Sequence, residues 1–120
     1  MRVYISGPMT GIPGYNIPVF CAAAKKLRAV GHFVINPAEL SSIFGTPDEI
    51  NNWYTFPRSP EGTSRNRERF DAMMDADLAA VRSCDAIYLL RGWEKSRGAK
   101  KELAEAIAHG LRVMQEGGEE

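Results

Sequence analysis

Asp77 is an acidic residue at an apolar position of a helical repeat. The segment from about Glu68 to Ser83 carries apolar residues at helical spacing, namely Phe70, Met73, Met74, Leu78 and Val81. Asp77 lies four residues after Met73 and four before Val81, so it belongs to the same face of the helix. Burial of an unpaired carboxylate is unfavourable. We therefore expect Asp77 to line a cleft or take part in chemistry, with a salt bridge or a helix-end cap as the structural alternative.

Glu102 is the second candidate for chemistry. It lies three residues after Ala99 and four before Ala106, at the border of the apolar face of a helix predicted from about Arg97 to His109. This helix follows the loop at residues 91–96, at the carboxyl end of a predicted strand where ligands bind, and its N-terminus favours an anion. The alternative is an ordinary glutamate in the first turns of a surface helix.

Two glycine-containing turns could hold a phosphate or a sugar hydroxyl. The first reads Gly7-Pro8-Met9-Thr10-Gly11-Ile12-Pro13-Gly14, and the second reads Ser96-Arg97-Gly98. The first matches neither the dinucleotide-binding fingerprint nor the P-loop. Backbone N–H groups near a helix N-terminus can nevertheless bind such groups.

Charge is balanced over the chain and uneven along it. Fifteen basic residues offset fifteen acidic ones, which argues against a nucleic-acid polymer or a membrane surface as partner. Residues 58–69 and 91–102 are locally basic, which fits an anionic small molecule. His32 and His109 each adjoin a glycine at a predicted helix end, and no cluster has metal-ligand spacing, so neither a metal nor another cofactor is expected.

The elements that must position these residues alternate between strand and helix. Strands are predicted at residues 2–6, 33–35, 86–90 and 111–114, and helices at residues 17–30, 68–83 and 97–109. Asn16 is the expected N-cap of the first helix, Gly31 and Gly110 the expected C′ glycines. This order predicts a three-layer α/β/α sandwich with a small parallel, flavodoxin- or Rossmann-like sheet of strand order 2-1-3-4. Ligands of such folds bind at the carboxyl ends of the strands.

The length of 120 residues predicts one domain over residues 1–120. Residues 41–66 form a proline- and glycine-containing insert with a capping-box turn at residues 46–53, and residues 115–120 an acidic, flexible tail. Cys21 and Cys84 are expected to be buried free thiols. The chain lacks a signal-peptide pattern and a long apolar run, so a cytoplasmic location is expected.

Three segments together resemble a known family. They are Tyr4-Ile5-Ser6-Gly7-Pro8, the helix of Asp77 before Asp85-Ala86-Ile87, and Ser96-x-Gly98-x-x-x-Glu102-Leu103. The chain resembles the nucleoside 2-deoxyribosyltransferase-like family over nearly its whole length except residues 41–66. The most similar branch consists of short uncharacterised bacterial and phage members, and deoxynucleoside-monophosphate N-glycosidases are related to it.

This resemblance implies N-glycosidic bond cleavage or exchange on a 2′-deoxynucleotide or deoxynucleoside. Glu102 would be the nucleophile that attacks C1′ of the sugar, and Asp77 would help to orient or protonate the substrate. The implied substrate-binding residues are Tyr4, Gly7, Pro8, Met9, Thr10, Gly11, Trp93, Ser96 and Gly98. The base would stack on Trp53, Tyr54 or Trp93. No cofactor is implied, and the assembly would be a homodimer or larger.

The residue type at position 96 indicates which group the substrate carries at its 5′ end. The resemblance places a serine here in nucleotide hydrolases and an aspartate in nucleoside transferases, so Ser96 predicts a preference for 5′-monophosphates. A catalytically silent nucleotide-binding or sensing module of the same fold remains an alternative, as does a scaffold that recruits a partner through residues 41–66. The identity of the base and the choice between water and a second base as acceptor stay open.

Overall fold

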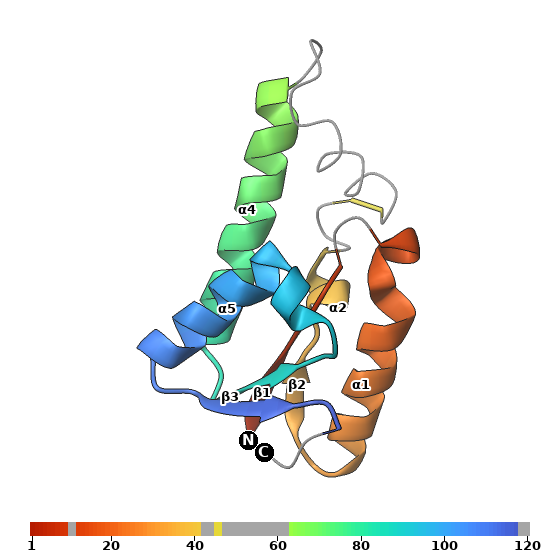
Figure 1. Ribbon diagram of the computed structural model, residues 1–120, viewed down its shortest axis with the longest axis vertical. Coiled ribbons are helices and arrows are strands. Elements are labelled where there is room, and N and C mark those ends of the chain that lie inside the picture. The colour runs from red at the N-terminus through yellow and green to blue at the C-terminus, as the bar shows by residue number, and fades with distance from the viewer. Residues whose placement is uncertain (10–11, 42–44, 47–62, 118–120) are drawn as a thin grey trace.

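The computed structural model describes residues 1–9, 12–41, 45–46 and 63–117, which form a parallel sheet with helices packed around it (Figure 1). The strands are β1 (Arg2–Ser6), β2 (Phe33–Ile35), β3 (Ala86–Leu89) and β4 (Arg112–Gln115). The helices are α1 (Ile17–Ala29), α2 (Pro37–Ser41), α4 (Thr63–Arg82) and α5 (Arg97–Ala108), with short 3-10 helices η1 (Pro13–Asn16) and η2 (Trp93–Lys95).

The strand order is β2-β1-β3-β4, and every neighbouring pair is parallel. Val3 of β1 lies opposite Val34 of β2 and Ala86 of β3, so β1 is a central strand. The predicted α/β fold and its strand order 2-1-3-4 are therefore confirmed. Because all strands run the same way, their carboxyl ends meet at one edge of the sheet, where the candidate residues were expected.

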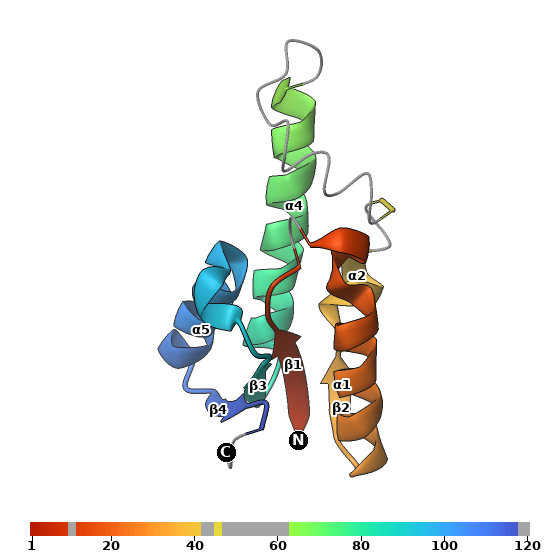
Figure 2. The ribbon, with the colours of Figure 1, turned by 45° about the vertical axis from the view of Figure 1, so that its right-hand side comes forward.

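Alternate residues of the strands pack against different helices. Val3 and Ile5 belong to an apolar cluster with Phe20, Ala24 and Leu27 of α1. The strand residues of the other cluster are Tyr4, Ile87 and Leu89, which pack with Val81 of α4 and Ala106 of α5. Figure 2 shows the result, with α1 on one side of β1 and α5 on the other. This two-sided covering is what a parallel sheet requires.

Asn16 and Gly31 lie at the two ends of α1 as expected, but Asn16 does not make the expected capping hydrogen bond. Asn16 occupies the N-cap position with φ 58°, yet its side chain makes no capping hydrogen bond. Its amide instead donates to the Pro8 carbonyl oxygen at 2.7 Å and so ties the turn after β1 to the start of α1. Gly31 follows α1 with φ 98° and Gly110 follows α5 with φ 74°, as expected of C′ glycines.

Two helical segments differ from the sequence prediction. Helix α4 begins at Thr63, five residues before the predicted start near Glu68. The extra turn is polar, and apolar periodicity marks only the residues of a helix that face a core. Helix α2 was not predicted; the Asn36 carboxamide oxygen accepts the Ala38 N–H at 3.0 Å and caps it. Residues 47–62, which include most of the predicted capping-box turn, lie outside the described residues.

Cys21 is exposed although it was expected to be buried, and so are two apolar side chains, Val30 and Ile107, whose helical spacing also predicts burial. Cys21 is exposed because it lies beside the buried face of α1, so only Cys84 is the predicted buried thiol. Val30 is 71% exposed because α1 ends at the preceding residue, and Ile107 is 63% exposed on the outer side of α5. None of the described helices is sufficiently long and apolar to cross a membrane.

Candidate active site

Glu102 is buried between α5 and the sheet and holds two hydroxyl groups. The Tyr4 hydroxyl donates to Oε2 at 2.7 Å, and the Ser6 hydroxyl donates to Oε1 at 2.6 Å. Tyr4 and Ser6 are two residues apart on β1, so both side chains project to the side that α5 covers. Only 5% of Glu102 is exposed. The carboxylate therefore joins α5 to β1 through two short hydrogen bonds.

Asp77 reaches the same region from α4. It is 7% exposed, and its Oδ1 atom is buried without a hydrogen-bond partner among the described residues. The alternative of a salt bridge finds no support in the described part of the chain, where the ion pairs join Arg28 to Glu39 and Glu105 to Arg82 and His109. An unpartnered buried carboxyl oxygen is costly in a native protein, and a bound ligand is one partner that could satisfy it.

Burial raises the pKa of both carboxyl groups, but their hydrogen bonding differs. Burial, together with the charge of Glu102, raises the pKa of Asp77 to about 8. Burial also raises the pKa of Glu102, to about 7, while the hydrogen bonds from Ser6 and Tyr4 act in the opposite direction. Both carboxyl groups thus hold a proton more readily than a solvent-exposed acid does, and the two hydroxyl donors favour the ionised form of Glu102 alone.

The turn after β1 contacts Leu90, the apolar cluster on the α1 side and the start of α1. A Cβ atom on Gly7 would lie 2.7 Å from the Leu90 Cβ, so this close approach requires glycine. Met9 is buried in the apolar cluster on the α1 side. Pro8 accepts the hydrogen bond from Asn16. Thr10 and Gly11 lie outside the described residues, and substrate binding by this turn stays a prediction.

The second glycine turn forms the start of α5. The Ser96 hydroxyl oxygen accepts the Ala99 N–H at 3.2 Å and caps the helix. A Cβ on Gly98 would lie 3.5 Å from Met74 Cε of α4, an ordinary contact distance. The turn therefore brings α5 against α4, and it does so without requiring glycine for packing. Its predicted role toward the substrate is not tested by these contacts.

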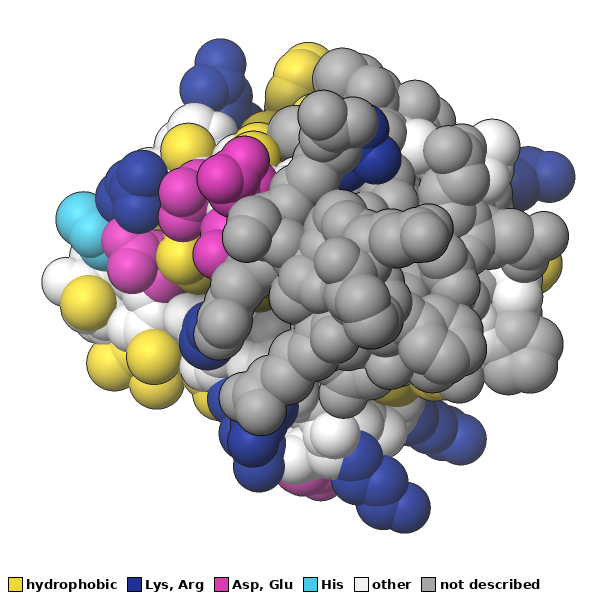
Figure 3. Space-filling model, turned by 90° about the horizontal axis from the view of Figure 1, so that it is seen from above, with side chains coloured by type: hydrophobic (Ala, Val, Ile, Leu, Met, Phe, Trp, Pro, Cys, Tyr) yellow, Lys and Arg dark blue, Asp and Glu magenta, His cyan; other side chains and the backbone are white. Residues whose placement is uncertain are grey.

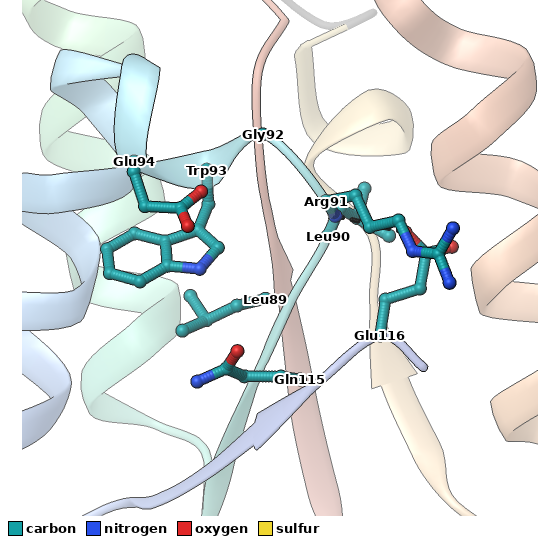
Figure 4. A pocket seen from close by; sticks show the side chains of 8 residues that line it. All are labelled: Leu89, Leu90, Arg91, Gly92, Trp93, Glu94, Gln115 and Glu116. Carbon is teal, nitrogen blue, oxygen red and sulfur yellow. Dashed lines mark hydrogen bonds between the residues drawn. The ribbon is translucent and has the colours of Figure 1, made fainter. Parts of the chain in front are cut away.

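Trp93 lines a pocket at the carboxyl ends of β3 and β4 (Figure 4). The pocket has a volume of about 260 Å³ and is lined by Leu89, Leu90, Arg91, Gly92, Trp93, Glu94, Gln115 and Glu116. In Figure 4, Leu89 and Gln115 lie below the indole and Glu94 lies beside it. Asp77 and Glu102 do not line this pocket, so Trp93 is the one predicted site residue that it includes. Trp53 and Tyr54 lie outside the described residues.

The charged residues near the start of α5 lie on the surface. All five basic residues of segment 91–102 are exposed: Arg91, Lys95, Arg97, Lys100 and Lys101. Seen from above, Lys and Arg side chains project at several separate places around the outline, and most of the acidic side chains in view lie on the left (Figure 3). Within the described ranges, no three His, Cys, Asp or Glu side chains are placed to hold a metal ion.

Ser6 is the site residue that the sequence reasoning missed. A signal was present, because Tyr4 and Ser6 are alternate residues of a predicted strand and so place two hydroxyl groups on one face. Nothing local indicated that Glu102, 96 residues later, would lie opposite them.

Comparison with known proteins supports a family and a fold. A family described as "Domain of unknown function (DUF4406)" matches residues 1–115. No curated protein sequence matches the chain. A solved structure reported under a title on the 2-deoxyribosyltransferase of Bacillus psychrosaccharolyticus is similar, with a TM-score of 0.60 and 19% identity over 96% of this chain and 71% of that one. The likeness confirms the α/β fold that the resemblance implied. By the match over residues 1–115, the chain belongs to the DUF4406 family of domains of unknown function.

Proposed function

We propose that this protein cleaves or exchanges the N-glycosidic bond of a 2′-deoxynucleotide or 2′-deoxynucleoside. The observation that carries the proposal is the buried carboxyl pair, in which Glu102 is held by two hydroxyl groups and Asp77 keeps an unpartnered oxygen. A pair of carboxyl groups with unequal pKa values can serve as nucleophile and proton donor on one bond.

In the first step, the Glu102 carboxylate attacks C1′ of the sugar. A bond forms between a carboxylate oxygen and C1′ while the bond from C1′ to the base nitrogen breaks. The electron pair of the broken bond stays on the base, which takes the proton of Asp77. The pKa of about 8 for Asp77 keeps that proton available at neutral pH.

In the second step, the sugar leaves Glu102. A water molecule attacks C1′ and gives its proton to the Asp77 carboxylate, and the electron pair of the C1′–oxygen bond returns to Glu102. If a second base takes the place of water, the result is exchange rather than hydrolysis. Tyr4 and Ser6 stabilise the carboxylate as it leaves, because both donate hydrogen bonds to it.

The fold adds support to this proposal. The similar solved structure is described as a 2-deoxyribosyltransferase. The wider expectations from the resemblance, a small-molecule substrate and a homo-oligomeric assembly, remain proposals for this chain. So does the catalytic role of each residue.

The direct test is release of free base. The four 2′-deoxynucleosides and their 5′-monophosphates would be incubated with the protein, and free base measured by chromatography. We expect release from at least one of them. Binding without release from any would contradict an enzyme and favour the nucleotide-binding module.

Glu102→Gln should then reduce base release by at least about a thousandfold, because an amide cannot act as the nucleophile. The melting temperature should change little, because the loss of one acceptor oxygen is offset by the removal of a buried ionisable group. Glu105→Gln is the matched control: it lies on the same helix, and its partners are Arg82 and His109 rather than the candidate site. Turnover near that of the unmodified protein in Glu102→Gln would exclude Glu102 as nucleophile.

A further inference from the structure

Both oxygens of Glu102 already accept a hydroxyl group of the protein. The hydrogen bond from Ser6 to Oε1 measures 2.6 Å, and Ser6 is fully buried. Ser6 ends the central strand β1, where it pairs with Leu89 of β3 and its carbonyl oxygen accepts the Leu90 N–H at 2.8 Å. The sheet thus fixes the backbone of Ser6 opposite Glu102, and the hydrogen bond to Oε1 orients its hydroxyl.

The hydrogen bonds to Glu102 can be related to the 2-hydroxyl group of a sugar substrate. In glycoside hydrolysis, hydrogen bonds to the 2-hydroxyl of the sugar strengthen in the transition state and contribute to the rate. A 2-deoxy sugar has no such hydroxyl. A nucleophilic carboxylate that acts on a 2-deoxy sugar must therefore obtain its hydrogen bonds elsewhere.

We propose that Ser6 is a positioning residue that donates to Glu102 in place of a substrate 2-hydroxyl and makes the site selective for 2-deoxy sugars. The inference rests on the function proposed above. A ribosyl substrate would bring a hydroxyl that has to share a carboxylate oxygen already bonded to a protein hydroxyl, and a desolvated hydroxyl with a weakened hydrogen bond costs binding free energy. A 2-deoxyribosyl substrate loses nothing, because Ser6 makes the contact instead.

The test compares sugar preference between variants. Base release would be measured for the unmodified protein, Ser6→Ala and Ser6→Cys, with each 2′-deoxy substrate of the base-release screen and its ribo counterpart. We expect Ser6→Ala to lower kcat/KM for the deoxy substrate by about tenfold or more, with a smaller loss for the ribo substrate, so the deoxy preference falls. Ser6→Cys, which keeps a weak donor, should lie between the two.

Ser41→Ala is the matched control. Ser41 is also buried, and its hydroxyl donates to the Ala38 carbonyl oxygen at 3.1 Å in α2 rather than to a carboxylate. This variant loses one buried hydrogen bond like Ser6→Ala, but its sugar preference should equal that of the unmodified protein.

A second readout does not depend on turnover. With ¹³C-labelled glutamate, the Glu102 carboxyl signal, assigned by its loss in Glu102→Gln, would be followed against pH. Ser6→Ala should raise the pKa of Glu102, because the carboxylate loses a donor, and Ser41→Ala should leave it unchanged. An unchanged titration in Ser6→Ala would overturn the positioning role.

The failures are distinguishable. If the unmodified protein releases base from no substrate, the proposed function and this inference both fall. If it releases base and Ser6→Ala keeps the same deoxy-to-ribo ratio, only this inference falls. Should Ser6→Ala fail to fold, the comparison of Ser6→Cys with the unmodified protein decides by the same criterion.

Discussion

The two sides of β1 come from the same five residues and are used differently. On the side toward α1, Val3 and Ile5 belong to an apolar cluster with Phe20, Ala24 and Leu27. On the side toward α5, Tyr4 and Ser6 donate to the buried carboxylate of Glu102. The first side gains the free energy of apolar burial, while the second desolvates ionisable groups. We infer that the α1 side adds more to stability than the α5 side, where the cost of desolvating Glu102 offsets part of the apolar burial.

The sharpest test of this comparison sets Ile5 against its functional neighbours. Ile5→Ala should lower the free energy of unfolding by about 2–5 kcal/mol, because it leaves a cavity in the fully buried α1 side. Urea unfolding would measure the loss. Glu102→Gln, on the other side of the sheet, should show little change in the same experiment. A change below about 1 kcal/mol for Ile5→Ala would contradict the division between the two sides.

Asp77→Asn should stabilise the protein in a pH-dependent way. The pKa of Asp77 is raised from 3.8 to about 8 in the folded protein. Between these values the folded chain binds a proton that the unfolded chain has released, so stability falls as pH rises through this window. Asparagine has no charge to desolvate and escapes this loss.

The difference in free energy of unfolding between Asp77→Asn and the unmodified protein should therefore be near zero at pH 4. It should grow to about 2 kcal/mol or more in favour of the variant by pH 8. Thermal melts across this pH range would measure it. A constant difference over the whole range would show that Asp77 is not a buried acid.

Substitutions at Gly7 and Gly98 can distinguish a packing requirement for glycine from a role in substrate binding. Gly7→Ala should cost about 1–3 kcal/mol, because its Cβ would lie 2.7 Å from the Cβ of Leu90 in the buried core. Gly98→Ala should change stability by no more than about 0.5 kcal/mol, because its Cβ would meet Met74 at 3.5 Å. If Gly98→Ala lowers kcat/KM without lowering the melting temperature, the predicted approach of substrate to Gly98 is supported. Equal losses of stability in the two variants would refute the contrast.

The smallest expected change is at the start of α5. Ser96→Asp should keep the melting temperature, because aspartate is also a good N-cap for the helix that Ser96 caps. It should weaken binding of a 5′-monophosphate by at least about tenfold through charge repulsion, and affect the nucleoside little. Calorimetric titration with both ligands measures this. Equal affinity of the unmodified protein for nucleoside and monophosphate would remove the predicted preference.

Local spacing along the sequence was sufficient to predict the four strands, the three longer helices and the two carboxyl candidates, but not helix α2. The strands at residues 2–6 and 33–35 were predicted with the bounds that the structure shows. Asp77 was recognised because a charge at an apolar position of a helical repeat is visible within a few residues, and the structure confirms its burial. Periodicity records which face of an element turns inward, and that property depends on neighbouring residues alone.

Only the tertiary structure shows which face of each helix or strand is covered and which side chains lie opposite it. Val30 and Ile107 share the apolar character of their neighbours but are exposed, because no element covers them among the described residues. The sequence around Ser6 indicates only a strand residue, whereas the structure places Glu102 opposite it. Contacts between residues nearly one hundred positions apart depend on how the helices pack onto the sheet, and the spacing within any one segment carries no record of that packing.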